Sequence, residues 1–123
     1  MVEGTEGRLS YRGYNIDDLA EKATVEEVVY LLWYEELPNP AQLQAFQEKL
    51  AAARPVPEAM LRLLRDLPAT GAPIDALRTI TSALALIDPD AENLERDAVL
   101  SKATILTARM PTSLAAYERL RHN

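Results

Sequence analysis

Apolar residues recur at spacings of three and four along most of this chain, and the pattern is most nearly continuous from Pro73 to Ile87. The residues that fall on one side of a helix there, at about 100° per residue, are Ile74, Leu77, Ile80, Leu84 and Ile87. Asp75, Arg78 and Ser82 share one sector of roughly 60°, which is narrower than the polar face of an ordinary surface helix. We therefore expect protein to cover this helix nearly all round, from other helices of the chain, from a second copy of the chain, or from both.

Capping residues and prolines mark where the other helices begin and end. Thr24 with Glu27 has the pattern of a capping box, and Asn39 before Pro40 is a second helix start. Pro111 is expected to kink or break the last helical stretch. Besides 73–87, the helices predicted in this way cover a short segment after residue 15 and the ranges 25–34, 40–54, 57–67, 91–110 and 112–121.

The only part with an extended pattern lies at the start of the chain, from Val2 to Tyr11. Gly4 and Gly7 bracket a turn within it, so we expect a short N-terminal β-hairpin. Asn15 then looks suited to cap the first helix. The sequence therefore predicts an all-α fold of seven helical segments, with this hairpin as its one extended part.

The connections between the predicted helices are short and contain proline, which leaves no room for a second domain. We expect a single helical domain over residues 1–123, large enough to bury a core of its own. On the helix predicted over 91–110, Leu94 is one of the residues expected to face inward.

Composition narrows the class of protein. Apolar residues make up 48% of the chain, which indicates a globular protein rather than a disordered one. The net charge of −6, with no run of lysine and arginine, argues against nucleic-acid binding and against a basic membrane-binding face. The chain has no cysteine and no signal-peptide pattern, and we predict a cytoplasmic location.

The residues alone predict no catalytic, cofactor-binding or metal-binding site. The single histidine, His122, is next to the last residue and is interpreted as a favourable cation at a helix C-terminus rather than a general base. Tyr30, Trp33 and Tyr34 are interpreted as core aromatics rather than a ligand-stacking platform. No metal-ligand spacing, phosphate-binding loop or nucleophile–base pair is present.

Four stretches, taken together, resemble the N-terminal part of the citrate synthase family, which includes the methylcitrate synthases. They are GRLSYRGYNIDDLA, VEEVVYLLWYEELP, APIDALRTITSALALIDPDA and ARMPTSLAAYERLRH, they follow the family's order, and they cover nearly the whole chain. The family condenses oxaloacetate with an acyl-CoA, acetyl-CoA in the case of citrate. The resemblance implies a mainly helical protein that forms part of the family's large domain.

The resemblance also implies what this chain does not match. The family's catalytic histidines, its catalytic aspartate and the arginines that hold oxaloacetate lie downstream of the four stretches, so no catalytic residue is carried over and His122 is not one of them. The family often has glycine where this chain has Glu35, at the end of a helix, and glutamate in a left-handed C-cap costs about 1 kcal/mol. It often has histidine where this chain has Ala72.

The resemblance further implies that the helices 57–67 and 73–87 belong to the family's dimer interface. We expect a homodimer whose contact lies at or beside Met60, Leu64, Ala76, Ile80, Ala83 and Leu84. The leading hypothesis is thus a truncated citrate-synthase-like chain, inactive by itself, that keeps dimerisation and scaffold helices. The alternatives are a regulatory protein that pairs with a full-length citrate synthase subunit, and an unrelated helical binding module. The sequence does not decide between citrate and methylcitrate as the parent product.

Overall fold

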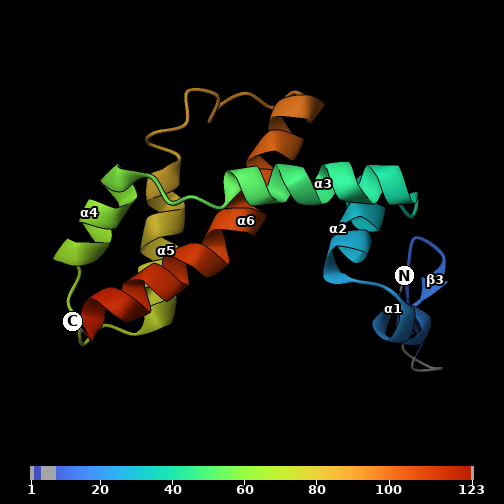
Figure 1. Cartoon of the computed structure of the whole chain (residues 1–123), viewed down its shortest axis with the longest axis horizontal. Helices are drawn as coiled ribbons and strands as arrows, with labels where there is room; N and C mark the ends of the chain where they lie inside the picture. The colour runs from blue at the N-terminus through green and yellow to red at the C-terminus, as the bar shows by residue number, and fades with distance from the viewer. Residues whose placement is uncertain (1, 4–7, 123) are drawn as a thin grey trace. The chain divides into compact units, whose positions relative to one another are not determined.

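The computed structural model describes residues 2–3 and 8–122 and confirms a mainly helical fold with a small N-terminal sheet (Figure 1). The strands of this part of the chain are β1 (Val2–Glu3), β2 (Arg8–Tyr11) and β3 (Tyr14–Asn15). Its helices are α1 (Ile16–Lys22), α2 (Val25–Tyr34), α3 (Pro40–Ala53), α4 (Glu58–Asp66), α5 (Pro73–Leu84) and α6 (Arg96–Arg121). None of these helices is long and apolar enough to cross a membrane.

The chain divides into two compact units, Met1–Lys49 (unit 1) and Leu50–Asn123 (unit 2), and each is described by itself. In unit 1, β1 and β2 pair antiparallel, as the predicted hairpin requires, with Val2 opposite Leu9. The turn predicted between Gly4 and Gly7 lies outside the described residues.

Strand β3 is an addition that the sequence did not predict. It pairs antiparallel with β2, with Tyr11 opposite Tyr14, across a two-residue turn at Arg12 and Gly13. Both turn residues have positive φ, 49° and 90°. Such a turn matches the twist of the strands that it joins, although the left-handed region is costly for Arg12.

The predicted helix starts in unit 1 are confirmed by their capping bonds. The Asn15 side chain accepts from the Asp17 amide at 3.0 Å. The capping box at α2 is reciprocal, because Thr24 Oγ1 accepts from the Glu27 amide at 3.3 Å and Glu27 Oε2 accepts from the Thr24 amide at 2.7 Å. A similar reciprocal pair joins Asn39 and Gln42 at the start of α3.

Glu35 ends α2 in the left-handed conformation, with φ 71° and ψ 2°. Its amide donates to the Leu31 carbonyl at 2.9 Å, as in a glycine-terminated helix. Arg12 forms an ion pair with the Glu35 carboxylate at 3.0 Å and donates to the Leu32 carbonyl at 3.5 Å. The two non-glycine residues of positive φ therefore contact each other at the carboxyl end of α2.

Unit 2 is built from α4, α5 and α6, which contact one another pairwise. Its buried core consists of Met60, Leu64, Ala76, Ile80, Leu84 and Tyr117. Ala76, Ile80 and Leu84 are four residues apart and form the inner face of α5. The outer face of α5 includes Ile74, whose exposed fraction is 68%.

The last helix differs from the prediction at Pro111, where two helices were expected. Instead α6 continues from Arg96 to Arg121 with Pro111 inside it, and Figure 1 shows the ribbon changing direction between its orange and red parts. Proline removes one backbone bond and can kink a helix without ending it. Beside this proline, the Thr112 hydroxyl donates to the carbonyls of Arg109 and Arg54, at 3.0 and 2.9 Å.

The connection between α5 and α6 is longer than predicted. Helix α5 ends at Leu84, and tighter backbone bonds continue as far as Ile87, where the prediction ended the helix. Helix α6 begins at residue 96 rather than 91, because the side chains of Asp88 and Asn93 accept from the amides of Asp90 and Glu95 and favour turns. The expectation that Leu94 faces inward was wrong, since the residue is 84% exposed.

Candidate functional site

The predicted interface residues lie mainly inside unit 2. Met60, Leu64, Ala76, Ile80 and Leu84 have exposed fractions of 1–7% within this single chain. Ala83 is half-buried and packs against the same cluster. These side chains form the inner layer of α4 and α5, so a partner chain would meet the outer faces of the two helices.

The outer face of α5 is mixed in character. Asp75 and Arg78 form an ion pair at 3.0 Å. The hydroxyl of Thr79 donates to the Asp75 carbonyl at 2.8 Å. Ile74 at the start of the helix and Leu86 just beyond its end are 68% and 87% exposed. This face carries apolar groups that the unit itself does not cover.

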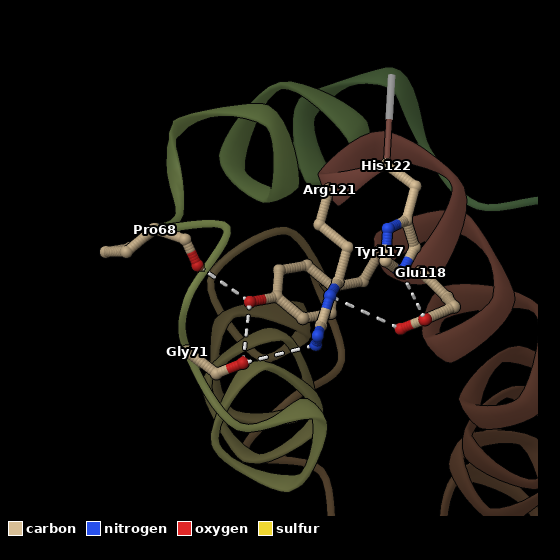
Figure 2. Close-up of polar contacts among 6 residues, drawn as sticks. All are labelled: Pro68, Gly71, Tyr117, Glu118, Arg121 and His122. Atoms are coloured by element: carbon tan, nitrogen blue, oxygen red, sulfur yellow. Dashed lines mark hydrogen bonds and ion pairs between the residues drawn. The ribbon is translucent and has the colours of Figure 1, made fainter.

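The carboxyl end of α6 is joined to the α4–α5 connection by Tyr117 (Figure 2). Its ring is buried, and its hydroxyl donates toward the carbonyls of Pro68 and Gly71, at 2.8 and 3.2 Å. Arg121 donates to the Gly71 carbonyl at 3.4 Å. A Cβ at Gly71 would lie 3.1 Å from the Tyr117 hydroxyl and 3.2 Å from the Pro68 carbonyl, so a side chain there would have to displace one of them slightly.

His122 contacts only its own helix among the residues that the structure describes. Its Nε2 lies 2.8 Å from Glu118 Oε1, and the same carboxylate lies 3.6 Å from Arg121 Nε (Figure 2). All three side chains sit on the last turns of α6, and His122 is exposed. Among the described residues, no hydrogen bond or ion pair joins this histidine to another element.

The aromatic residues of α2 gather around Phe46 of α3. The rings of Tyr30 and Trp33 meet Phe46 edge-on, with centroids 5.5 and 5.6 Å apart, and Tyr34 lies 4.3 Å from Tyr30. Phe46 is 4% exposed. The arrangement covers a buried ring, as predicted for core aromatics, and leaves a shallow open hollow beside Lys49.

Unit 2 contains a cleft of about 430 Å³ between α5, the connection that follows it and α6. Its walls are mainly apolar, and its polar lining side chains are Thr81, Asp88, Lys102 and Arg109. Lys102 donates to three backbone carbonyls of the connection, those of Asp90, Ala91 and Asn93, at 2.5–3.0 Å.

Sequence reasoning missed both cations of this cleft. Lys102 and Arg109 lie on the α6 stretch KATILTAR, where apolar residues surround each charge. Both are half-buried. A cation within an apolar helical pattern must find acceptors, and that pattern was the available signal.

Among the residues that the structure describes, Glu58 has a pKa that departs from its ordinary value. The hydrogen bond from Arg65 is the main reason that the pKa of the Glu58 carboxyl lies below its ordinary value; desolvation opposes it, and the charges of Arg65 and Arg62 add a lesser lowering. The Arg65 Nη1 to Glu58 Oε1 distance is 2.9 Å. Both side chains are exposed, so this is a surface pair. Within residues 2–3 and 8–122, no group of three histidine, cysteine, aspartate or glutamate side chains could hold a metal ion.

Comparison with known proteins places these helices in one family. The family model described as "Citrate synthase, C-terminal domain" matches residues 1–123. Citrate synthase from Haloferax volcanii is 43% identical over 98% of this chain and 33% of its own length. The 2-methylcitrate synthase of Shewanella oneidensis is 38% identical over 94% of this chain and 30% of its own length.

Solved structures agree with the sequence comparison. The crystal structure of citrate synthase from Pyrobaculum aerophilum matches with a TM-score of 0.87 and 31% identity, over 95% of this chain and 31% of that one. Citrate synthase from Thermotoga maritima matches with a TM-score of 0.84 and 34% identity, over 99% and 31%. The chain thus spans about a third of the length of the proteins it matches. It belongs to the citrate synthase family.

Proposed function

We propose that this chain supplies scaffold and self-association helices of a citrate-synthase-like large domain and does not by itself condense oxaloacetate with an acyl-CoA. The proposal rests on where the potentially reactive side chains of the chain lie and what they contact. The one histidine pairs with Glu118 on its own helix, and the cleft between α5 and α6 contains no nucleophile–base pair among its lining residues. A cytoplasmic location stays a prediction.

The catalytic part of the proposal is tested by release of free CoA. Purified chain with oxaloacetate and either acetyl-CoA or propionyl-CoA should release CoA no faster than buffer. Oxaloacetate at millimolar concentration should also leave the melting temperature unchanged, because a ligand stabilises only the state that binds it. Release that requires both substrates and persists in His122→Ala would contradict the proposal.

The association part concerns the outer faces of α4 and α5. Since the predicted interface residues fill the inner layer, a second copy would cover the exposed Ile74 and Leu86. A closed two-fold contact lets one such patch cover itself. We therefore propose a homodimer through the helices 57–67 and 73–87, with Met60, Leu64, Ala76, Ile80, Ala83 and Leu84 directly beneath the contact.

Light scattering tests the homodimer at micromolar concentration. Ile74→Glu places a charge in the proposed contact and should give a folded monomer, because an unpaired buried charge is strongly unfavourable. Val25→Glu is the matched control, since Val25 is 76% exposed on α2 and lies outside the two helices. Glu92→Ala should also leave the dimer intact, whereas Ala83→Glu should disturb the core of unit 2. A wild-type monomer would refute the homodimer, and an Ile74→Glu dimer would place its contact elsewhere.

A further inference from the structure

We propose that the cleft between α5, its following connection and α6 binds one amphiphilic carboxylate, a medium-chain alkanoate, whose carboxylate pairs with Arg109. The cleft volume of about 430 Å³ lies in the range of small-molecule sites. The inference goes beyond the proposed function and does not depend on it, because a scaffold needs no ligand here.

The walls of the cleft suit a hydrocarbon chain. The apolar side chains that line it include Pro57, Leu84, Ile87, Ile105 and Leu106. Ile87 is 43% exposed and Leu84 is buried, so apolar surface runs from the rim toward the core. Burying a chain there removes apolar surface of both ligand and protein from water.

Most polar groups of the cleft are already engaged. The Thr81 hydroxyl donates to the Leu77 carbonyl at 2.7 Å. Asp88 accepts from the Asp90 amide at 2.9 Å. Lys102 has three N–H donors and uses them on three carbonyls, so it has no donor left for a ligand.

Arg109 is the exception. Its Nε donates to the Ala53 carbonyl at 3.1 Å, which fixes the guanidinium against the carboxyl end of α3. Its two Nη groups have no partner among the residues that the structure describes. A guanidinium with free donors accepts a carboxylate in a planar, two-pronged pair. The cleft therefore combines an apolar chain site with one anchored cation.

The charge balance selects a singly charged ligand. Arg109 is the one cation of the lining with donors to spare, and the Asp88 carboxylate lies in the same lining. A second negative charge on the ligand would meet Asp88 without a cation to offset it, since like charges repel at close range. An alkanoate is thus favoured over a phosphate ester or a tricarboxylate.

The test is a titration of the isotope-labelled chain at neutral pH, followed by backbone amide NMR. Decanoate should cause saturable shifts in residues 81–91 and 102–109, and affinity should rise about three- to four-fold per methylene from hexanoate to decanoate. Decanol should bind at least ten-fold more weakly, and decyltrimethylammonium more weakly still. Equal binding of decanoate and decanol, or no saturable shift, would overturn the proposal.

Two substitutions and one control distinguish the contribution of Arg109 from that of the apolar lining of the cleft. Arg109→Gln should lower decanoate affinity to that of decanol while decanol binding is unchanged. Arg119→Gln makes the same charge change on the same helix outside the cleft lining and should change neither. Ala85→Phe fills the cleft from its exposed rim and should abolish both. If Arg109→Gln disturbs the fold by losing the Ala53 bond, Ala85→Phe decides, and unchanged decanoate binding in Ala85→Phe would overturn the site.

Discussion

The polar contacts inside unit 1 and those inside unit 2 join residues at different distances along the sequence. In unit 1 the capping bonds join residues two or three apart, as between Asn15 and Asp17 or Thr24 and Glu27. In unit 2 the corresponding bonds join residues about fifty apart, as from Arg109 to Ala53 and from Tyr117 to Pro68. Unit 1 therefore has its structure specified largely by neighbours in the sequence, whereas the connections of unit 2 depend on α6 being in place.

The contrast has a physical basis in how the backbone carbonyls outside the helices find hydrogen-bond donors. Loops carry backbone groups that need partners, and helix caps supply them only at helix ends. In unit 2 the carbonyls of the 53–54 and 68–71 segments accept instead from side chains of α6. A change in α6 should therefore loosen two connections at once.

The largest expected effect comes from Tyr117, which tests that dependence directly. Tyr117→Ala removes a ring that is 2% exposed and should lower the free energy of unfolding by about 3–5 kcal/mol, as for other buried aromatics. Tyr117→Phe keeps the ring but removes the hydroxyl that donates to the Pro68 and Gly71 carbonyls. Because the Gly71 amide and Arg121 still donate to these carbonyls, the cost should be only about 1 kcal/mol. Amide hydrogen exchange should show reduced protection in unit 2. An equal reduction in α1 and α2 would contradict the view that only unit 2 depends on α6.

The next effect concerns Lys102 and the α5–α6 connection. Lys102→Met removes the donor of three carbonyls, and hydrogen bonds to charged groups contribute roughly 1.5–3 kcal/mol where buried. Because water can reach parts of this connection, we expect a loss of about 1–2 kcal/mol, with faster amide exchange confined to residues 85–95. Lys49→Met is the control, since exposed Lys49 has no hydrogen bond or ion pair with the residues that the structure describes. Unchanged exchange in the connection would show that the turns at Asp88 and Asn93 suffice.

A smaller effect, of opposite sign, is expected in unit 1 at Glu35. Glu35→Gly relieves a left-handed conformation that costs a non-glycine residue about 1 kcal/mol. It also removes the Arg12 ion pair, but exposed pairs contribute only about 0–1 kcal/mol. Chemical denaturation should therefore show equal or higher stability, by up to about 1 kcal/mol. Glu36→Gly, at the neighbouring exposed position, should not stabilise, and a clear loss in Glu35→Gly would mean that the ion pair outweighs the strain.

The same contrast explains which parts of the fold were predictable. Asn15, Thr24 with Glu27, and Asn39 with Pro40 are local signals, and the structure begins α1, α2 and α3 where they indicated. The hairpin also followed from local alternation. The prediction failed at Pro111, which α6 passes without ending. It also failed in the connection before α6, which extends to residue 95 with local turns at Asp88 and Asn93 and three bonds from Lys102.

The sites were less predictable than the elements. The narrow polar stripe of α5 did not indicate which of its apolar sides faces the core of its own chain. The packing shows that Ala76 and Ile80 face inward while Ile74 is exposed. The cleft could not be foreseen at all, because its lining comes from segments up to fifty residues apart, Pro57 and Arg109 among them. The family resemblance predicted a mainly helical protein but pointed to no residue of that cleft.

The smallest expected effect concerns a short-range pair in unit 2, the unit in which the other contacts discussed are long-range. Glu58 and Arg65 both lie on α4, and the pKa of Glu58 is lowered mainly by the Arg65 hydrogen bond. A lowered pKa in the folded state means that the pair stabilises the fold above the ordinary pKa of glutamate, and that this contribution is lost as the pH falls through the folded-state pKa. Arg65→Gln should return the Glu58 pKa toward its ordinary value in a carboxyl-carbon NMR titration, with little change in stability at neutral pH because the pair is exposed. Arg62→Gln removes only a weaker charge interaction and should raise the pKa less. An equal rise in both variants would show that general charge, rather than the Arg65 hydrogen bond, sets the pKa of Glu58.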